Sequence, residues 1–378
     1  MRIIFLDTYY PNFLSSLYEE FRELEAAGYQ DQLSRLMSEC FGTSDFYSRH
    51  MNQLGHEAVD IIANCTKLQE AWCNENNEKF SALASHIPYY LQKKTLFRGI
   101  SKYLGGTISA TIKQVKSFRP DILYCQDLWF LSEADFMELR PYAKVIVGQI
   151  ASPLPPVRYL KCYDLILTSF PHFVPKLRSL GVTSDYFPIG FEETLINKVG
   201  IKERDIDISF VGGVSRHHAS AIDLLEYLAE ETPIQFFGYG SKLLPRSSKI
   251  RQKHFGEVWG LGMYQTLSRS KITINRHINV AENYANNMRL YEATGMGALL
   301  ITDQKDNISE LFTPGKEIVT YRDKEDARNK IVYYLEHPHE ALQIAKAGQL
   351  RTLRDHTYKI RIDELNVILN KFLVTKNL

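Results

Sequence analysis

The sequence predicts an α/β protein with two domains, each built around a parallel sheet. Apolar runs of strand length alternate with segments of helical periodicity along the chain. The runs are apolar throughout, which is typical of strands that helices cover on both faces. The chain has 378 residues, more than one ordinary hydrophobic core accommodates. Alternating strands and helices of this kind favour Rossmann-like domains.

The first half contains six segments of strand character. They are residues 2–7, 57–63, 121–126, 144–149, 164–169 and 184–189. Between them, residues 44–55 have helical character, with Thr43 or Ser44 as the expected N-cap. A second helix is expected over residues 100–118, because its apolar residues share one helical face. These apolar residues are Leu104, Ile108, Ile112 and Val115.

Residues 11–42 form an insertion after the first predicted strand. Leu14, Leu17, Tyr18 and Phe21 begin an apolar stripe that continues to Leu24. A helical hairpin that packs on its own domain explains this stripe. The alternative is a wall that contacts an acceptor, a partner protein or a membrane surface.

The second half repeats the alternation. Strands are expected at residues 207–212, 234–238, 271–275, 298–302 and 317–321. Helices are expected near residues 217–231, 262–270, 288–296 and 323–336, followed by two closing helices at 338–353 and 356–373.

The domain boundary is expected in the polar segment between Pro188 and Arg204. The predicted domains are residues 1–195 and 196–355. A C-terminal helix follows at 356–378, and it could pack back on the first domain. Their sheets are expected to face each other across a cleft. Ligands of such sheets bind at the carboxyl ends of the strands, so these ends are where functional residues are expected.

The composition excludes several classes of protein. Charged residues make up 24% and hydrophobic residues 44% of the chain, as in soluble globular proteins. A formal net charge of +1 argues against nucleic acid as a partner. The apolar run before Asp7 is too short for a signal peptide or a membrane span. The five cysteines show no metal-ligand spacing. We therefore expect a cytoplasmic protein whose membrane contact is at most peripheral.

Two glycine-containing turns follow strands of the second domain. Gly212 and Gly213 precede a helix, where a phosphate could meet backbone amides and the Arg216 side chain. A plain tight turn explains the glycines equally well, because neither a dinucleotide fingerprint nor a P-loop is present. Further on, backbone groups near Val258 and Trp259 could hold a nucleotide base. The alternative is that Trp259 is a core aromatic residue.

The run NMRLYEATGMGALLITD (287–303) predicts a helix followed by a buried strand. Asn287 can cap this helix, so that the amides around Met288 are available to a diphosphate. Glu292 can accept the two hydroxyl hydrogen bonds that a ribose offers. Arg289 lies three residues earlier on the same helical face. An ordinary surface Arg–Glu pair is the alternative interpretation.

These residues resemble those of a known family. The run 287–303, FVGG with Arg216, HFGEV, LFTPGKE and HTY at 356–358 are similar to the CgeB-like spore-maturation proteins, a group of GT-B-fold glycosyltransferases. The resemblance covers roughly residues 206–365 well. It is thinner in the first domain, where it involves mainly LGHEAVDIIAN and FRPDILY.

The resemblance implies roles for individual residues. Glu292 matches the second glutamate of the E-x-x-x-x-x-x-x-E motif, which binds the nucleotide ribose. The first glutamate falls at Tyr284, so that acid is missing and the stereochemistry stays open. Arg289 and Arg216 then neutralise the diphosphate. The family needs no metal, and Asp205-Ile206-Asp207 opens a strand rather than forming a metal site.

If the enzyme inverts, its catalytic base is expected at the strand ends of the first domain. Asp7, Asp127 and His172 each follow a predicted strand. A capping or core role is the alternative for each of them.

We therefore expect a metal-independent, hexosyltransferase-type enzyme of polysaccharide biosynthesis. Its co-substrate is a nucleoside diphosphate sugar, with UDP or dTDP as the carrier. Its acceptor is a glycan, a glycoprotein or a lipid-linked molecule. The alternatives are a sugar-nucleotide 2-epimerase of the same fold and a non-catalytic nucleotide-sugar-binding protein.

Overall fold

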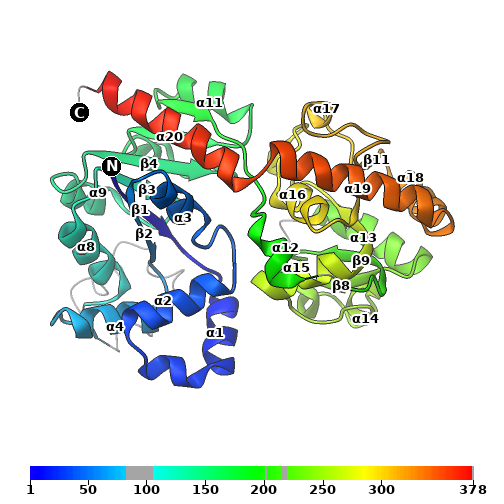
Figure 1. Cartoon of the computed structure of the whole chain (residues 1–378), viewed down its shortest axis with the longest axis horizontal. Coiled ribbons are helices and arrows are strands. Elements are labelled where there is room, and N and C mark those ends of the chain that lie inside the picture. The colour runs from blue at the N-terminus through cyan, green and yellow to red at the C-terminus, as the bar shows by residue number, and fades with distance from the viewer. Residues whose placement is uncertain (82–104, 201, 215–218, 377–378) are drawn as a thin grey trace. The chain divides into compact units, whose positions relative to one another are not determined.

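The computed structural model describes residues 1–81, 105–200, 202–214 and 219–376 (Figure 1). The chain divides into two compact units, each with its own parallel sheet. Unit 1 comprises Met1–Phe187 and Ile362–Leu378, and unit 2 comprises Pro188–Arg361. The division falls at the start of the polar segment 188–204. The last helix, α20 (Tyr358–Thr375), begins in unit 2 and continues in unit 1.

The sheet of unit 1 has the strand order β2-β1-β3-β4-β5-β6 and is parallel throughout. Its strands are β1 (Arg2–Asp7), β2 (Glu57–Ile62), β3 (Ile122–Cys125), β4 (Val145–Ile150), β5 (Leu165–Thr168) and β6 (Ser184–Tyr186). Each strand predicted for this half is present. The strands β3 and β5 are buried along their whole length, as helices on both faces require.

The helices of unit 1 connect these strands (Figure 1). They are α1 (Pro11–Glu20), η1 (Arg22–Ala26), α2 (Tyr29–Ser38), α3 (Phe46–Gln53), α4 (Thr66–Glu75), α8 (Thr107–Phe118), α9 (Glu133–Leu139), α10 (Val157–Leu160) and α11 (Phe173–Ser179). The predicted cap of α3 is wrong. Asp45 occupies the N-cap position, and Ser44 instead donates a hydrogen bond of 2.7 Å to the Met37 carbonyl. Leu104 of the predicted second helix lies outside the described residues.

The apolar stripe of the insertion faces inward. Leu14, Leu17 and Tyr18 are buried on α1. The Tyr18 hydroxyl donates a hydrogen bond of 2.6 Å to Gln32 Oε1 on α2, and α2 packs against α4. The insertion is therefore a helical hairpin packed on its own unit, and its stripe is not an exposed wall.

The sheet of unit 2 has the strand order β11-β10-β9-β7-β8 and is also parallel. Its strands are β7 (Ile206–Val211), β8 (Gln235–Phe237), β9 (Ser270–Asn275), β10 (Leu299–Asp303) and β11 (Val319–Tyr321). Its helical segments are α12 (Thr194–Val199), α13 (Ala219–Glu231), η3 (Ser241–Leu243), α14 (Lys249–Gln252), α15 (Gly260–Arg269), η4 (Asn279–Ala281), α16 (Met288–Gly295), α17 (Ile308–Leu311), α18 (Lys324–Glu336) and α19 (Pro338–Asp355).

The core of unit 2 is formed by aliphatic side chains from its strands and from α13, α18 and α19. The middle strand β9 contributes Ile272 and Ile274, and β10 contributes Leu299 and Ile301. This rigid core fixes the carboxyl ends of the strands, from which the loops to α13, α15 and α16 extend. Within the described part of the chain, no helix is long and apolar enough to cross a membrane.

Candidate functional site

The N-terminus of α16 lies at the carboxyl end of β9. Asn287 is the N-cap in an extended conformation, and its Oδ1 accepts a hydrogen bond of 3.3 Å from the Leu290 amide. Its Nδ2 donates a hydrogen bond of 2.8 Å to Asn275 Oδ1, at the end of β9. The first-turn amides of a helix have no intrahelical acceptor and attract anions. The predicted cap is thus in place, and it holds the helix N-terminus at the edge where ligands bind.

Arg289 and Glu292 form an ion pair on α16. Arg289 Nη1 lies 2.8 Å from Glu292 Oε2, and the two side chains are only 14% and 6% exposed. The Tyr264 hydroxyl of α15 donates a hydrogen bond of 3.4 Å to Glu292 Oε1. Burial raises the pKa of Glu292, and Arg289 and Tyr264 only partly offset this effect. The alternative of a surface pair is therefore wrong, because a buried charged pair is costly to desolvate and rarely serves stability alone.

The last turn of α16 packs tightly against other parts of unit 2. A Cβ atom on Gly295 would lie 2.6 Å from the Phe191 ring. The Thr294 and Thr352 hydroxyls are 2.6 Å apart. The turn into β10 uses Gly297, whose φ of 76° suits glycine. Gly295 therefore serves packing, and Gly297 makes the turn.

His356 of the HTY run has a structural role. Its Nε2 donates a hydrogen bond of 2.9 Å to the Leu311 carbonyl, and its Nδ1 accepts one of 2.8 Å from Arg361 Nη2. Burial and the neighbouring arginines lower the pKa of His356 to about 4. The ring is therefore neutral at physiological pH, and it contacts Tyr291 of α16.

The glycine turn after β7 lies against an aromatic pair. A Cβ atom on Gly213 would lie 2.3 Å from Tyr239 Cζ, so any other residue requires the Tyr239 ring to move. The Tyr239 ring stacks on Trp259, with 5.6 Å between centroids and 12° between the planes. Val258 and Trp259 are half-buried just before α15. The structure thus brings the predicted base residues close to the predicted phosphate turn, whereas Arg216 lies outside the described residues.

Two of the three candidate bases come together in unit 1. Asp7 ends β1, and Asp127 lies in the loop after the neighbouring strand β3. Thr8 bridges them: its amide donates a hydrogen bond of 2.7 Å to Asp7 Oδ1, and its hydroxyl donates one of 2.8 Å to Asp127 Oδ2. Burial and the Asp127 charge raise the pKa of Asp7 to about 7. Asp7 can therefore exchange a proton near neutral pH.

His172 does not join this pair. It follows β5, which β4 separates from β3, and it is the N-cap residue of α11. Its ring packs against Phe170 and Phe173, with centroid distances of 5.2 and 4.8 Å. The structure therefore favours the alternative structural role for His172.

A further acid near Asp7 escaped the sequence analysis. Asp60 lies on β2, beside β1, and its side chain is hydrogen-bonded by the Ser48 hydroxyl. Burial together with the charges of Asp45 and Asp7 raises the pKa of Asp60 to about 8. The sequence signal is an acid in the middle of the run EAVDIIA, where the neighbouring residues are apolar.

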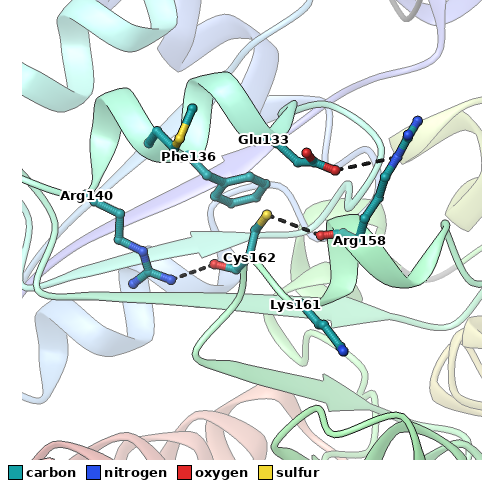
Figure 2. A pocket seen from close by; sticks show the side chains of 7 residues that line it. Glu133, Phe136, Arg140, Arg158, Lys161 and Cys162 are labelled. Atoms are coloured by element: carbon teal, nitrogen blue, oxygen red, sulfur yellow. Dashed lines mark hydrogen bonds and ion pairs between the residues drawn. The ribbon is translucent and has the colours of Figure 1, made fainter.

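Unit 1 also contains a surface pocket of about 480 Å³ (Figure 2). Its lining residues are Glu133, Phe136, Met137, Arg140, Arg158, Lys161 and Cys162. Arg140 and Cys162 directly precede β4 and β5, at the amino ends of these strands. Arg140 forms an ion pair with Asp164. Arg158 forms one with Glu133, with 3.5 Å between Nε and Oε1. The pocket therefore extends toward the sheet edge opposite to Asp7 and Asp127, and two of its three cations, Arg140 and Arg158, are paired with acids.

The chain is similar to known proteins in part of its sequence and in its fold. Residues 216–366 match the family model described as glycosyl transferase-like. No curated protein sequence matches the chain significantly. Among solved structures, sucrose-phosphate synthase from Thermosynechococcus elongatus is similar over 99% of this chain and 100% of its own, with a TM-score of 0.59 and 12% identity.

Two further structures are similar over 98% of this chain. HepE from Anabaena, in complex with UDP-glucose, has a TM-score of 0.60 and 12% identity over 100% of its own chain. A glycosyltransferase from Rickettsia africae has a TM-score of 0.57 and 14% identity over 99% of its own chain. The chain therefore has the fold of GT-B glycosyltransferases, with a glycosyl transferase-like domain at residues 216–366.

Proposed function

We propose that the protein is a glycosyltransferase that uses a nucleoside diphosphate sugar without a metal ion. The observation that carries the proposal is the buried Arg289–Glu292 pair at the N-terminus of α16. A carboxylate and a guanidinium at this position match the hydroxyl groups and the phosphates of a nucleotide. The similarity to HepE, a protein whose complex contains UDP-glucose, supports the same class of donor.

In this proposal, unit 2 holds the donor. The α16 amides at Asn287 and Met288 and the Arg289 side chain bind the diphosphate, together with the Gly213 turn. Glu292 accepts hydrogen bonds from the ribose. The base lies at Val258 and Trp259. Positive groups fixed around a leaving diphosphate stabilise the charge that builds up during transfer, which is the work a metal ion performs in other enzymes.

If transfer inverts the configuration at the anomeric carbon, we propose that unit 1 provides the proton acceptor. A hydroxyl oxygen of the acceptor forms the new bond to the anomeric carbon, and the bond from that carbon to the diphosphate breaks. The electron pair leaves with the diphosphate, and the hydroxyl proton passes to Asp7. A carboxylate with a pKa near 7 suits this step, because it is partly ionised at neutral pH yet basic enough to accept the proton. The acceptor is proposed to be a glycan, a glycoprotein or a lipid-linked molecule.

Calorimetric titration tests the donor site. UDP, dTDP, ADP and GDP are titrated in EDTA, and at least one of them should bind with micromolar affinity. Glu292→Ala should weaken that binding, whereas Glu336→Ala, on the exposed end of α18, should not. If no nucleoside diphosphate binds, or if binding requires a divalent cation, the proposal is wrong. Release of nucleoside diphosphate from its sugar only when an acceptor is added separates a transferase from an epimerase.

A further inference from the structure

Besides Arg289 Nη1, which forms only its ion pair with Glu292, two buried side-chain nitrogens near the start of α16 lack a hydrogen-bond partner among the described residues. They are His277 Nε2 and Asn286 Nδ2. His277 is 4% and Asn286 7% exposed. A buried polar nitrogen without a partner is costly, and each such group in a folded protein requires an explanation. A ligand that supplies the missing partners is one explanation.

The other face of His277 is fixed by Asp303. His277 Nδ1 lies 2.7 Å from Asp303 Oδ1, and the His277 amide donates a hydrogen bond of 3.1 Å to the same oxygen. Burial acts to raise the pKa of Asp303, but His277 and Lys305 outweigh it, so that the pKa is lowered and the carboxyl is ionised. An ionised carboxylate can only accept, so Nδ1 carries a proton and Nε2 is the atom left for another partner.

A chain of hydrogen bonds connects His277 to the cap of α16. Asn287 Nδ2 donates to Asn275 Oδ1 at 2.8 Å, and Asn275 Nδ2 donates to Thr302 Oγ1 at 2.9 Å. The Thr302 hydroxyl donates to Asp303 Oδ1 at 3.3 Å. The imidazole is therefore fixed to the same network as the helix N-terminus proposed to bind the diphosphate.

We propose that His277 Nε2 and Asn286 Nδ2 are hydrogen-bond donors to the diphosphate of the nucleotide sugar. The inference rests on the proposed function, because it adds contacts to the same donor site. For Nε2 to donate while Nδ1 donates to Asp303, the imidazole must carry both protons. The Asp303 carboxylate and the phosphate oxygens are both hydrogen-bond acceptors, as two donating ring nitrogens require. His277 then balances charge on the leaving diphosphate in addition to Arg289.

Contact with a ligand requires the chain around His277 to rearrange, because its side chain has no exposed surface. The connection between β9 and α16 contains a residue that favours such a change. Glu282 has φ 50° and ψ −120°, a backbone conformation that is strained for any residue except glycine. Donor binding can relieve this strain as the connection adjusts.

The sharpest test is His277→Asn. The asparagine amide can take the place of Nδ1 and keep the bond to Asp303, while Nε2 is deleted. UDP is titrated in EDTA, with uridine as the ligand that lacks the diphosphate. We expect the affinity for UDP to fall about tenfold to a hundredfold, the usual loss for a hydrogen bond to a charged group. The affinity for uridine should stay within about twofold, since uridine lacks the group that His277 binds.

Three further variants separate binding from structure. His277→Gln places an amide near the position of Nε2 and should restore part of the UDP affinity. Asn286→Ala should weaken UDP binding by a smaller factor than His277→Asn. His339→Gln, an exposed histidine of the same unit, is the matched control and should bind like the wild type.

The outcomes distinguish this inference from the function it rests on. If wild-type protein binds no nucleoside diphosphate, both are wrong. If the wild type binds UDP and Glu292→Ala loses it, but His277→Asn binds UDP as the wild type does, only the role of His277 is overturned. The role of His277 is also overturned if His277→Asn loses affinity equally for UDP and for uridine and has a lower thermal midpoint. This pattern indicates a structural residue.

Discussion

Each unit has an acid at the carboxyl end of its sheet, buried Glu292 in unit 2 and half-buried Asp7 in unit 1, but among the described residues only Glu292 is paired with a cation. Glu292 lies 2.8 Å from Arg289. Among the residues that the structure describes, no basic side chain forms an ion pair with Asp7, and the negative charge of Asp127 acts on it. Burial raises the pKa of both groups. The paired acid is suited to holding hydroxyl groups, and the unpaired acid is suited to taking up a proton.

Among the variants, Asp7→Asn is expected to have the largest effect, which is a loss of catalytic rate. It removes the proton acceptor but keeps the shape and the hydrogen bond from Thr8 largely intact. We expect kcat to fall about 10²–10⁴-fold, the usual contribution of a general base, with little change in nucleotide affinity. The measurement is acceptor-dependent release of nucleoside diphosphate. Asp185→Asn, on the exposed strand β6, is the control. If Asp7→Asn is as active as the wild type, Asp7 is not the catalytic base.

Removing one or both partners of the buried Arg289–Glu292 pair tests how strongly the two charges of unit 2 interact. Arg289→Ala leaves Glu292 buried without its cation, and we expect a stability loss of about 3–5 kcal/mol. Arg289→Ala with Glu292→Ala should cost less than the sum of the single changes. Urea unfolding measures the free energy of unfolding of each of these variants.

The exposed pair Arg178–Asp185, with 3.9 Å between its charged atoms, is the matched control for this cycle. Its removal should cost less than about 1 kcal/mol, because water screens both charges. Additive losses at Arg289 and Glu292 would show that the two charges do not interact.

The stability of unit 1 should depend on pH because of Asp7. Its pKa is about 7 in the folded chain and 3.8 in the reference state. A carboxyl whose pKa is raised by folding favours the folded state at low pH. That contribution is fully present below pH 3.8 and is lost as pH rises toward 7.

Asp7→Asn should therefore be more stable than the wild type at pH 8, by about 1–4 kcal/mol, and should differ little from it at pH 4. Asp60→Asn should behave in the same way, with the transition extending to about pH 8. Urea unfolding at both pH values measures the difference. A variant that is less stable than the wild type at pH 8 would contradict the raised pKa.

The smallest expected effect comes from two glycines of unit 2. Gly213→Ala places a methyl group 2.3 Å from the Tyr239 ring and should disturb its stacking on Trp259. We expect a stability loss of about 1–3 kcal/mol from overpacking and weaker binding of UDP. Gly262→Ala, inside α15 with open space around it, should instead stabilise by up to about 1 kcal/mol. Thermal unfolding and UDP titration compare the two variants, and equal midpoints would show that Tyr239 moves away at little cost.

The sequence determined the fold to a large extent. Most of the predicted strands are present because they are apolar runs bounded by polar residues, and such runs are stable only in the interior. The edge strand β6, with the sequence SDY, is the exception. The short helices α9, α11 and α12 were not predicted, since each has fewer than eight residues and too few turns to show a periodic pattern. The cap at Ser44 was predicted wrongly because a local preference yielded to a tertiary hydrogen bond to Met37.

The sequence by itself also determined that Arg289 and Glu292 share one face of a helix, because three residues are close to one helical turn. Only the tertiary structure decided that this face is buried, that Thr8 joins Asp7 to Asp127, and that Asp303 fixes His277. These contacts join residues from different strands and loops. Their protonation states depend on desolvation by side chains that are distant in the sequence, and no local pattern records which side chains those are.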